Sequence, residues 1–265
     1  MEILGFIGAV IMGLSLGLIG GGGSILTVPI LVYLFNVDPV LSTAYSLFIV
    51  GFTSLIGGFN HMRIGNVKWD MVLLFGLPAI ASVYFTRAVI VPAIPDIIAQ
   101  NDLFTLSKSA AMLLLFAVLM IASSIGMIKS KKSESTTSSI SGKKRIALIL
   151  GEGIFVGAIT GLVGAGGGFL IIPALVLLAK LPMKKAVGTS LVIIAAKSLL
   201  GFTGDMQGDT AIDWDFLLLF SAIAVAGIVI GTLLTKRISG SKLKPVFGWF
   251  VLIMGIYVLS AELFL

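Results

Sequence analysis

The sequence predicts an all-α polytopic membrane protein made of two inverted-topology repeats, each a glycine-broken helical hairpin followed by three transmembrane helices. Three observations lead to this prediction: an apolar composition, a gap-free internal repeat, and the distribution of basic residues among the loops. The 265 residues are 58% hydrophobic and 11% charged, well outside the composition of soluble domains. Lipid is therefore the expected surroundings of most of the chain.

Apolar stretches long enough to enter a hydrocarbon core, which about 20 helical residues cross, recur along the chain. We expect all of them to be helical, because unpaired backbone groups cannot face lipid. The polar segment 129–145, rich in Ser, Thr and Lys, has the composition of a flexible linker between a first repeat, 1–128, and a second repeat, 146–265. The apolar stretches lie at 2–35, 40–62, 70–94, 104–128, 146–180, 186–205, 214–235 and 245–264.

The two halves are copies of each other. GLIGGGGSILTVPILVYL at 17–34 aligns without gaps with GLVGAGGGFLIIPALVLL at 161–178, at an offset of 161 − 17 = 144 residues. Unrelated apolar helices would share Leu and Val, but not Gly, Pro, Ser and Trp in the same order, so the match indicates a structural repeat. The same offset, with one inserted residue before the last pair, relates Ser46 to Ser190, Ser54 to Ser198, Gly57 to Gly201 and Trp69 to Trp214.

The first apolar stretch of each half is predicted to break. About 35 residues would form a helix of about 52 Å, whereas the hydrocarbon core is about 30 Å thick. Glycine runs at 20–23 and 164–168 disfavour a continuous helix and permit turns. Two topologies follow: a kinked span gives parallel repeats, and a hairpin that returns to its own side gives inverted repeats.

Basic residues favour the inverted topology. The segment 129–145 is the most basic loop, so the positive-inside rule places it in the cytoplasm. With hairpins, the basic loops near 63–68, 180–185 and 236–244 also face the cytoplasm, and the acidic loop residues face outward. With kinked spans, the loops at 180–185 and 236–244 would face outward. We therefore expect inverted repeats with both termini outside the cell.

Composition removes several functional classes. The chain has no cysteine, which excludes disulfides, thiolate catalysis and cysteine metal sites. The formal net charge is +6, but the basic residues border apolar segments, so we expect no nucleic-acid partner. The opening Met1-Glu2-Ile3 has neither a basic n-region nor a small-residue cleavage site, and is expected to begin the first membrane segment rather than a signal peptide.

The glycine runs predict an anion site. Each run ends where a new half-helix begins, near Ser24 and near Gly168, and helix N-termini attract anions through free N–H groups and the helix dipole. In inverted-repeat transporters such breaks form the substrate site near mid-membrane. The alternative for any single glycine is close helix packing. The substrate-binding candidates in the two runs are Gly21, Gly22, Gly23, Ser24, Gly166, Gly167 and Gly168.

The helix after each hairpin carries a polar stripe. Spacings of seven, eight and eleven residues place the members of each stripe on one helical face. The alternative is that the hydroxyls bond carbonyls of their own helix, as is common in membrane helices. The stripes comprise Ser46, Thr53, Ser54 and Gly57 in the first half, and Ser190, Lys197, Ser198 and Gly201 in the second. The substrate-binding candidates among them are Ser46, Thr53, Ser190, Lys197 and Ser198.

Lys197 is the residue that most favours an anionic substrate. It lies about ten residues from either end of its helix, and a lysine at that depth costs at least about 2.5 kcal/mol on insertion scales. Such a charge is functional by default, and here it would balance an anion. The alternative is a structural ion pair with Glu152 or Asp205.

Two further polar residues lie within apolar stretches. His61, the only histidine, follows Asn60 at the cytoplasmic end of its helix and can carry a coupled proton, because imidazole titrates near neutral pH. The favoured alternative is a histidine at a solvated loop edge. Arg87 lies toward the outer end of its helix, where it would neutralise Asp96 or meet lipid headgroups, and is not assigned to the substrate.

Taken together, GLIGGGGSILTVPIL, its repeat GLVGAGGGFLIIPAL and the element AVGTSLVII resemble the sulfite exporter TauE/SafE family over both halves of the chain. Ala44-Tyr45-Ser46 stands where the second half has Gly188-Thr189-Ser190. The resemblance therefore implies substrate-binding hydroxyls in the second copy first, at Thr189 and Ser190. It implies a multi-pass permease of a prokaryotic plasma membrane, associated with export of sulfite and organosulfonates such as sulfoacetate. The residues themselves indicate an anion, and sulfite enters only through the resemblance.

The sequence thus predicts a secondary transporter, an exporter of small anions, with an anionic substrate and the bilayer as partners and with no cofactor or metal. No Walker A pattern is present, so ATP hydrolysis is not expected. A cation or cation-coupled permease would need intramembrane acids, for which only Glu152 qualifies. An intramembrane enzyme would show paired carboxylates, an H-E-x-x-H pattern or a Ser/His pair, and a structural subunit needs no mid-membrane lysine. The coupling ion, the direction of transport and the oligomeric state, a homo-oligomer included, stay open.

Overall fold

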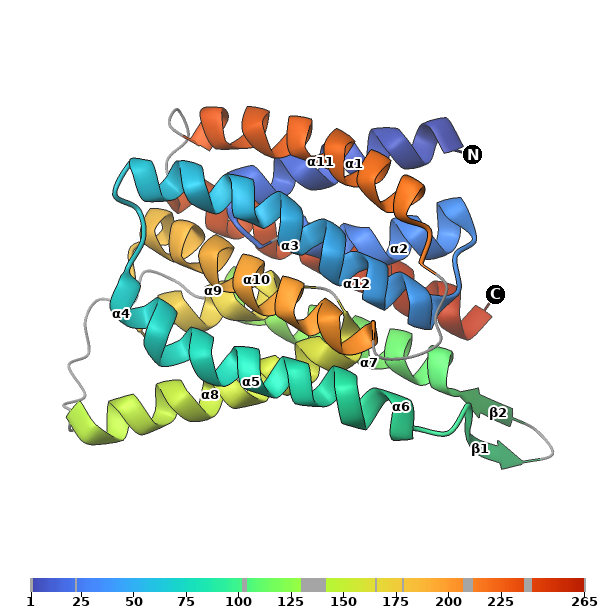
Figure 1. Cartoon of the computed structure of the whole chain (residues 1–265). Helices are drawn as coiled ribbons and strands as arrows, with labels where there is room; N and C mark the ends of the chain where they lie inside the picture. Colours follow the sequence, from blue (N-terminus) through green and yellow to red (C-terminus); the bar gives the residue numbers. More distant parts are fainter. Residues whose placement is uncertain are drawn as a thin grey trace.

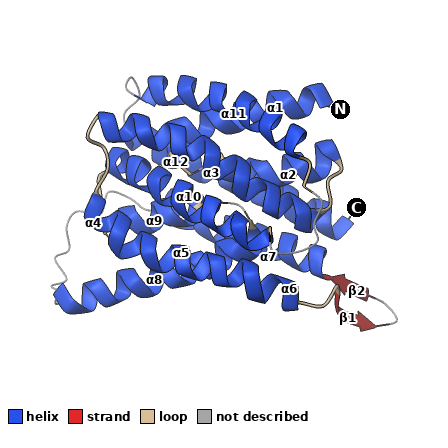
Figure 2. Ribbon diagram, in the orientation of Figure 1, coloured by secondary structure: helices blue, strands red, loops and turns tan. Residues whose placement is uncertain are grey.

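The computed structural model describes residues 2–21, 23–101, 104–129, 142–164, 166–177, 179–206, 212–235 and 240–264. These residues are almost entirely helical, with one small β hairpin at an end of the molecule (Figure 1, Figure 2). Six helices in the described ranges are long and apolar enough to cross a membrane. The fold is therefore the all-α polytopic membrane protein that the sequence predicts.

The first half is a broken helical pair followed by three long helical segments. Asp38 caps the third helix, because its carboxylate accepts hydrogen bonds from Val40 N and Leu41 N at 2.8 and 3.0 Å. The helices are α1 (Glu2–Ile19), α2 (Ser24–Phe35), α3 (Pro39–Arg63), a continuous span made of α4 (Trp69–Met71), η1 (Val72–Gly76), α5 (Leu77–Phe85), η2 (Thr86–Ile90) and α6 (Val91–Ala93), and α7 (Lys108–Lys129). Within that span, η1 and η2 are π-helical.

The second half repeats this order. It consists of α8 (Gly142–Val163), α9 (Gly168–Leu177), α10 (Met183–Asp205), α11 (Trp214–Thr235) and α12 (Gly240–Phe264). Thus α8 and α9 form the second broken pair, and α10, α11 and α12 are the three long helices. Helix α8 starts inside the segment 129–145, whose residues 130–141 lie outside the described part, so the linker and the division of the chain at that segment stay predictions.

The prediction of helix throughout 104–128 is wrong at its start. Strand β2 (Phe104–Ser107) pairs antiparallel with β1 (Ile97–Asn101), and α7 begins only at Lys108. The Ser107 side chain sets this boundary, because its Oγ accepts a hydrogen bond from Ala110 N at 3.1 Å and so caps the first turn of α7.

The long helices α3 and α10 lie side by side at the centre of the molecule and are the most buried of the six spans (Figure 1). Neighbouring positions show that they run in opposite directions: Gly51 faces Leu199, whereas Gly57 faces Leu191. Around this pair, the first helix of each half packs on the fourth segment of the other, α1 on α11 and α8 on α5. The last helices, α7 and α12, pack together.

Glycines allow these helices to approach closely. On α1, a Cβ at Gly17 would lie 2.5 Å from the carbonyl oxygen of Ile228 on α11. On α8, a Cβ at Gly157 would lie 2.5 Å from the carbonyl oxygen of Ala79 on α5. Small residues at such positions are the usual basis of helix packing in membranes, where no hydrophobic force acts between helices. The two halves are therefore interlocked through equivalent pairs of helices.

Candidate functional site

The two glycine segments cross inside the protein. A Cβ on Gly21 would lie 2.5 Å from Gly168 Cα, and a Cβ on Gly166 would lie 3.3 Å from Ser24 Cβ, so only glycine fits where the backbones touch. Gly21 of the first segment faces Gly168, whereas Ser24, further along the chain, faces the earlier Gly166. The two segments therefore run antiparallel. This crossing brings the starts of α2 and α9 together, as the repeat predicts.

Backbone geometry explains why the helices end here. Gly20 and Gly164, which are equivalent in the repeat, have φ values of 82° and 72°, a region that residues with a Cβ rarely adopt. Each also packs against the neighbouring long helix: Gly20 against Val187 on α10, and Gly164 against Thr43 on α3. Val187 and Thr43 are themselves separated by the repeat offset of 144 residues. The two breaks are thus built and held in the same way.

The start of α2 presents free backbone N–H groups. Gly23 occupies the cap position and no side chain caps the helix. Leu26 N donates to Gly23 O at 3.1 Å, but the first N–H groups of a helix have no carbonyl available within it. The Ser24 hydroxyl donates to Gly21 O at 2.7 Å, so its proton stabilises the turn. Gly22, also a candidate, lies outside the described residues.

Lys197 reaches the second glycine segment from the middle of α10. Its side chain is fully buried, and Nζ donates a hydrogen bond to Thr160 Oγ1 on α8 at 2.5 Å. A Cβ on Gly167 would lie 2.7 Å from Nζ, so the ammonium touches the backbone of the crossing. Among the described residues no carboxylate pairs with Lys197, so neither Glu152 nor Asp205 forms the structural ion pair considered from the sequence. A buried cation held only by a hydroxyl is the arrangement that an anion would complete.

Two of the hydroxyl candidates bond carbonyls of their own helices. Thr53 Oγ1 donates to Ile49 O at 2.6 Å, and Ser190 Oγ donates to Val187 O at 2.9 Å. Ser190 Oγ also lies 3.5 Å from Gly20 O, so it sits against the first glycine segment. For these two residues the own-helix alternative describes the structure, although Ser190 still lines the crossing.

Three other hydroxyls on the stripes have no such partner. The Oγ atoms of Ser46, Ser54 and Ser198 are buried and make no hydrogen bond in the described part of the protein. A buried hydroxyl without a partner costs free energy, commonly about 1–3 kcal/mol. Ser198 directly follows Lys197, and Ser46 is the repeat equivalent of Ser190. Unused hydrogen-bonding capacity therefore lies on both long central helices.

Thr189 and His61 take different places from those expected. Thr189 is buried, and its Oγ1 accepts a hydrogen bond from Lys68 N at 3.0 Å, so it anchors the loop before α4. The expectation of a solvated His61 is wrong: its side chain is fully buried, because Gly188 on α10 lets α3 approach, with a Cβ there 3.0 Å from His61 Cβ. His61 Nδ1 lies 3.5 Å from the Asn66 amide, and Nε2 has no partner in the described structure.

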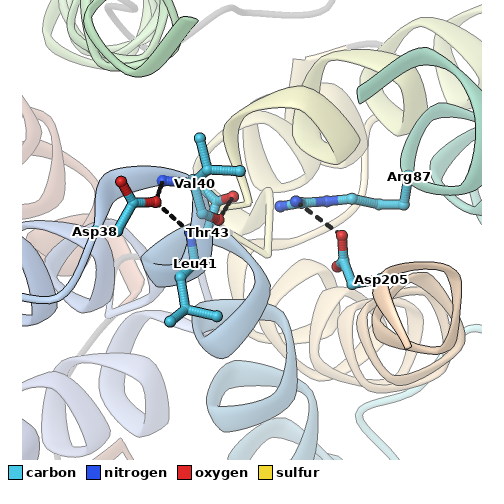
Figure 3. Close-up of polar contacts among 6 residues, drawn as sticks. All are labelled: Asp38, Val40, Leu41, Thr43, Arg87 and Asp205. Carbon is cyan, nitrogen blue, oxygen red and sulfur yellow. Dashed lines mark hydrogen bonds and ion pairs between the residues drawn. The ribbon is translucent and has the colours of Figure 1, made fainter. Parts of the chain in front are cut away.

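Sequence reasoning missed the role of Arg87. Its side chain is buried, and Nη1 pairs with Asp205 Oδ1 at 3.2 Å, joining η2 to the end of α10 (Figure 3). The expectation that Arg87 neutralises Asp96 or meets headgroups is therefore wrong. A signal was present, because an arginine within an apolar span needs an acid at the same depth and Asp205 ends the adjacent central helix.

Broken helices that meet between two repeats, with a buried cation beside them, define a multi-pass membrane transporter. The chain belongs to the sulfite exporter TauE/SafE family, whose sequence model matches residues 5–258. Export of sulfite is the known role of that family, and its members are membrane transporters rather than enzymes.

Curated relatives carry the same designation. A probable membrane transporter protein of Xylella fastidiosa is 29% identical over 94% of this chain and 91% of its own. Probable membrane transporter protein MJ0441 of Methanocaldococcus jannaschii is 27% identical over 97% and 93%, and YdhB of Bacillus subtilis is 26% identical over 88% and 90%. These bacterial and archaeal relatives agree with a plasma-membrane location. No solved structure matches the chain significantly.

Proposed function

We propose that this transporter exports small oxyanions, such as sulfite or organosulfonates, through a site at the crossing of its two glycine segments. The observation that supports the proposal most is the position of Lys197. Its ammonium is fully buried, touches the backbone at Gly167 and is held by a neutral hydroxyl. Burial removes the ammonium from water, and no carboxylate in the described structure offsets this desolvation cost. A bound anion would offset it.

The crossing offers an oxyanion several complementary contacts. Lys197 Nζ provides the charge, and the start of α2, with no side-chain cap, provides N–H groups and the positive end of a helix dipole. The unpartnered hydroxyls of Ser46 and Ser198 can donate to further oxygens. Sulfite and sulfonates carry three oxygens on one sulfur and can use donors from more than one direction. Family membership favours sulfite among these anions.

Inverted-topology repeats would give this site access to either side in turn. The antiparallel packing of α3 and α10 and the equivalent contacts of Gly20 and Gly164 support this topology. In Figure 1 the start of α1 and the end of α12 lie at one end of the molecule, and the start of α8 lies at the other. With the segment 129–145 in the cytoplasm, both termini would be outside. Movement of one repeat against the other about the crossing would then expose the site alternately.

The proposal is tested by flux in proteoliposomes. Purified protein is reconstituted, and uptake of radiolabelled sulfite is measured against rising concentrations of sulfoacetate, methanesulfonate, sulfate, and sodium or potassium. We expect saturable sulfite uptake that organosulfonates inhibit competitively and the cations do not. Saturable flux of a cation, with no flux of any of the anions, would reject the proposal and favour a cation permease.

A further inference from the structure

The ion pair between Arg87 and Asp205 uses only one nitrogen of the guanidinium, Nη1. Nη1 contacts Asp205 Oδ1 at 3.2 Å, whereas Nε and Nη2 are buried and make no hydrogen bond with any described residue. Nε and Nη2 form the edge that normally binds two oxygens of a carboxylate or phosphate side by side. The edge best suited to an oxyanion is therefore the one without a partner, within a span where bare donors are costly.

Three features of the structure around Arg87 are typical of a functional site. The residue lies in the π-helical segment η2, and π-bulges in helices are frequent at functional sites. Thr86, next to it, also has a buried hydroxyl without a partner. Both neighbouring helices come close through glycine, since a Cβ on Gly204 would lie 3.0 Å from Arg87 Cβ and a Cβ on Gly161 would lie 2.8 Å from Thr86 Cβ.

A cavity is lined in part by Asp205. It has a volume of about 150 Å³. Its lining includes Asp205, Tyr45 of α3 and Asp38, whose carboxylate already caps α3. Arg87 does not line this cavity, so Asp205 is the member of the ion pair that borders it. An anion entering there would reach Arg87 by taking the place of Asp205.

Packing contacts lead from the region of Arg87 toward the central site. Figure 3 shows the guanidinium pointing from η2 toward the first turn of α3, where Thr43 lies. Thr43 in turn contacts Gly164, with 2.5 Å between its Cα and a Cβ placed on that glycine. Gly164 begins the segment that leads to Gly167 and Lys197. Arg87 thus lies between one end of the protein and the crossing.

The other end of the protein lacks this charged pair. By the repeat offset, His61 is the equivalent of Asp205 and Thr232 is the equivalent of Arg87. Both are buried, and both His61 Nε2 and Thr232 Oγ1 have no partner among the described residues. A contact needed only for packing would be expected at both ends of a two-fold arrangement. The ion pair is therefore a feature of one end only.

We infer that Arg87 is a second oxyanion-binding residue, on the route between the Asp38 end of the protein and Lys197, and that Asp205 is the carboxylate that an incoming sulfite or sulfonate displaces. This inference rests on the proposed function for its place in transport. Binding at Arg87 is nevertheless separable from transport, because it needs only the guanidinium edge and an oxyanion.

The test measures methanesulfonate binding by calorimetry to detergent-purified protein. In Lys197→Ala, where the central charge is removed, we expect one remaining site. Adding Arg87→Lys should weaken that site by about tenfold, because an ammonium keeps the charge but loses the two-pronged edge. Adding Asp205→Asn instead should tighten binding severalfold, because the competing charge is gone.

A merely structural ion pair gives a different pattern. It predicts that both substitutions lower the melting temperature and leave methanesulfonate affinity unchanged, and either unchanged affinity or no binding at all to Lys197→Ala overturns the inference. If Asp205→Asn fails to insert, Arg87→Lys alone decides. Arg87→Asp alone should lower both the melting temperature and the affinity. Adding Asp205→Arg should restore the melting temperature but not the affinity, and restoration of both would overturn the inference. Methanesulfonate binding without sulfite flux in the unmodified protein would reject the proposed function alone.

Discussion

Lys197 Nζ donates a hydrogen bond to Thr160 Oγ1 across 2.5 Å, and this contact links the middle of α10 to the end of α8. It fixes the ammonium beside Gly167, near the end of the second glycine segment. Lys197 has no charged partner in the described structure, so the geometry of the cation depends on one hydroxyl.

Thr160→Val should therefore weaken substrate binding. Valine keeps the shape of threonine but removes the acceptor, and an unpaired buried group costs about 1–3 kcal/mol. We expect the half-saturation concentration for sulfite uptake to rise about tenfold, in line with that cost. Thr160→Ser, which keeps the hydroxyl, should behave as the unmodified protein. Equal uptake curves for the valine and serine variants would show that the contact does not position the cation.

Gly168→Ala should damage both stability and transport. Its Cβ would lie 2.9 Å from Gly21 O, and overpacking of this kind costs about 1–3 kcal/mol. Gly151→Ala is the matched control, because a Cβ at Gly151 meets no atom within 4 Å and alanine favours helix. Thermal unfolding in detergent should show a lower melting temperature for Gly168→Ala only. Identical melting curves for the two variants would contradict the crossing.

His61→Gln tests proton coupling. His61 is buried and Nε2 has no partner among the described residues, so proton coupling would require a conformational change that exposes the ring to water. We expect the variant to keep sulfite flux without a pH gradient and to lose acceleration by an imposed gradient. Flux is measured in proteoliposomes with matched and unmatched internal pH. A full response to the gradient in His61→Gln would remove this residue from coupling.

The topology is open to direct labelling, because the chain has no cysteine. In whole cells, a membrane-impermeant maleimide should label Asp96→Cys, and Ser138→Cys should react only after the membrane is permeabilised. These results follow from the positive-inside rule applied to the segment 129–145. Labelling of Ser138→Cys in intact cells would contradict the cytoplasmic placement of the segment 129–145.

The sequence was sufficient to predict the features that depend on local chemistry. Glycine runs cannot continue a helix across a stretch longer than the membrane, so both breaks were predictable, and the structure has them between Ile19 and Ser24 and between Val163 and Gly168. The repeat predicted their equivalence. The depth of Lys197 was readable from its distance to the helix ends, and the residue is fully buried.

Features that depend on pairing between distant segments were not predictable in the same way. The partner of Lys197 comes from α8, 37 residues away, and nothing in the pattern around Thr160 distinguishes it from other membrane hydroxyls. His61 was expected at a solvated edge, because its burial depends on the close approach of Gly188. The pairing of Arg87 with Asp205 joins different halves across 118 residues. Such contacts follow from how the halves interlock.

The most direct test of the central claim is sulfite flux through Lys197→Met in proteoliposomes, beside Lys180→Met, which removes an exposed charge instead. Replacing a buried, unpaired charge by an apolar side chain of similar length should not lower the melting temperature. We predict that Lys197→Met inserts normally and loses saturable sulfite flux, whereas Lys180→Met retains it. Saturable flux in Lys197→Met equal to that of the unmodified protein would contradict an anion site at the glycine crossing.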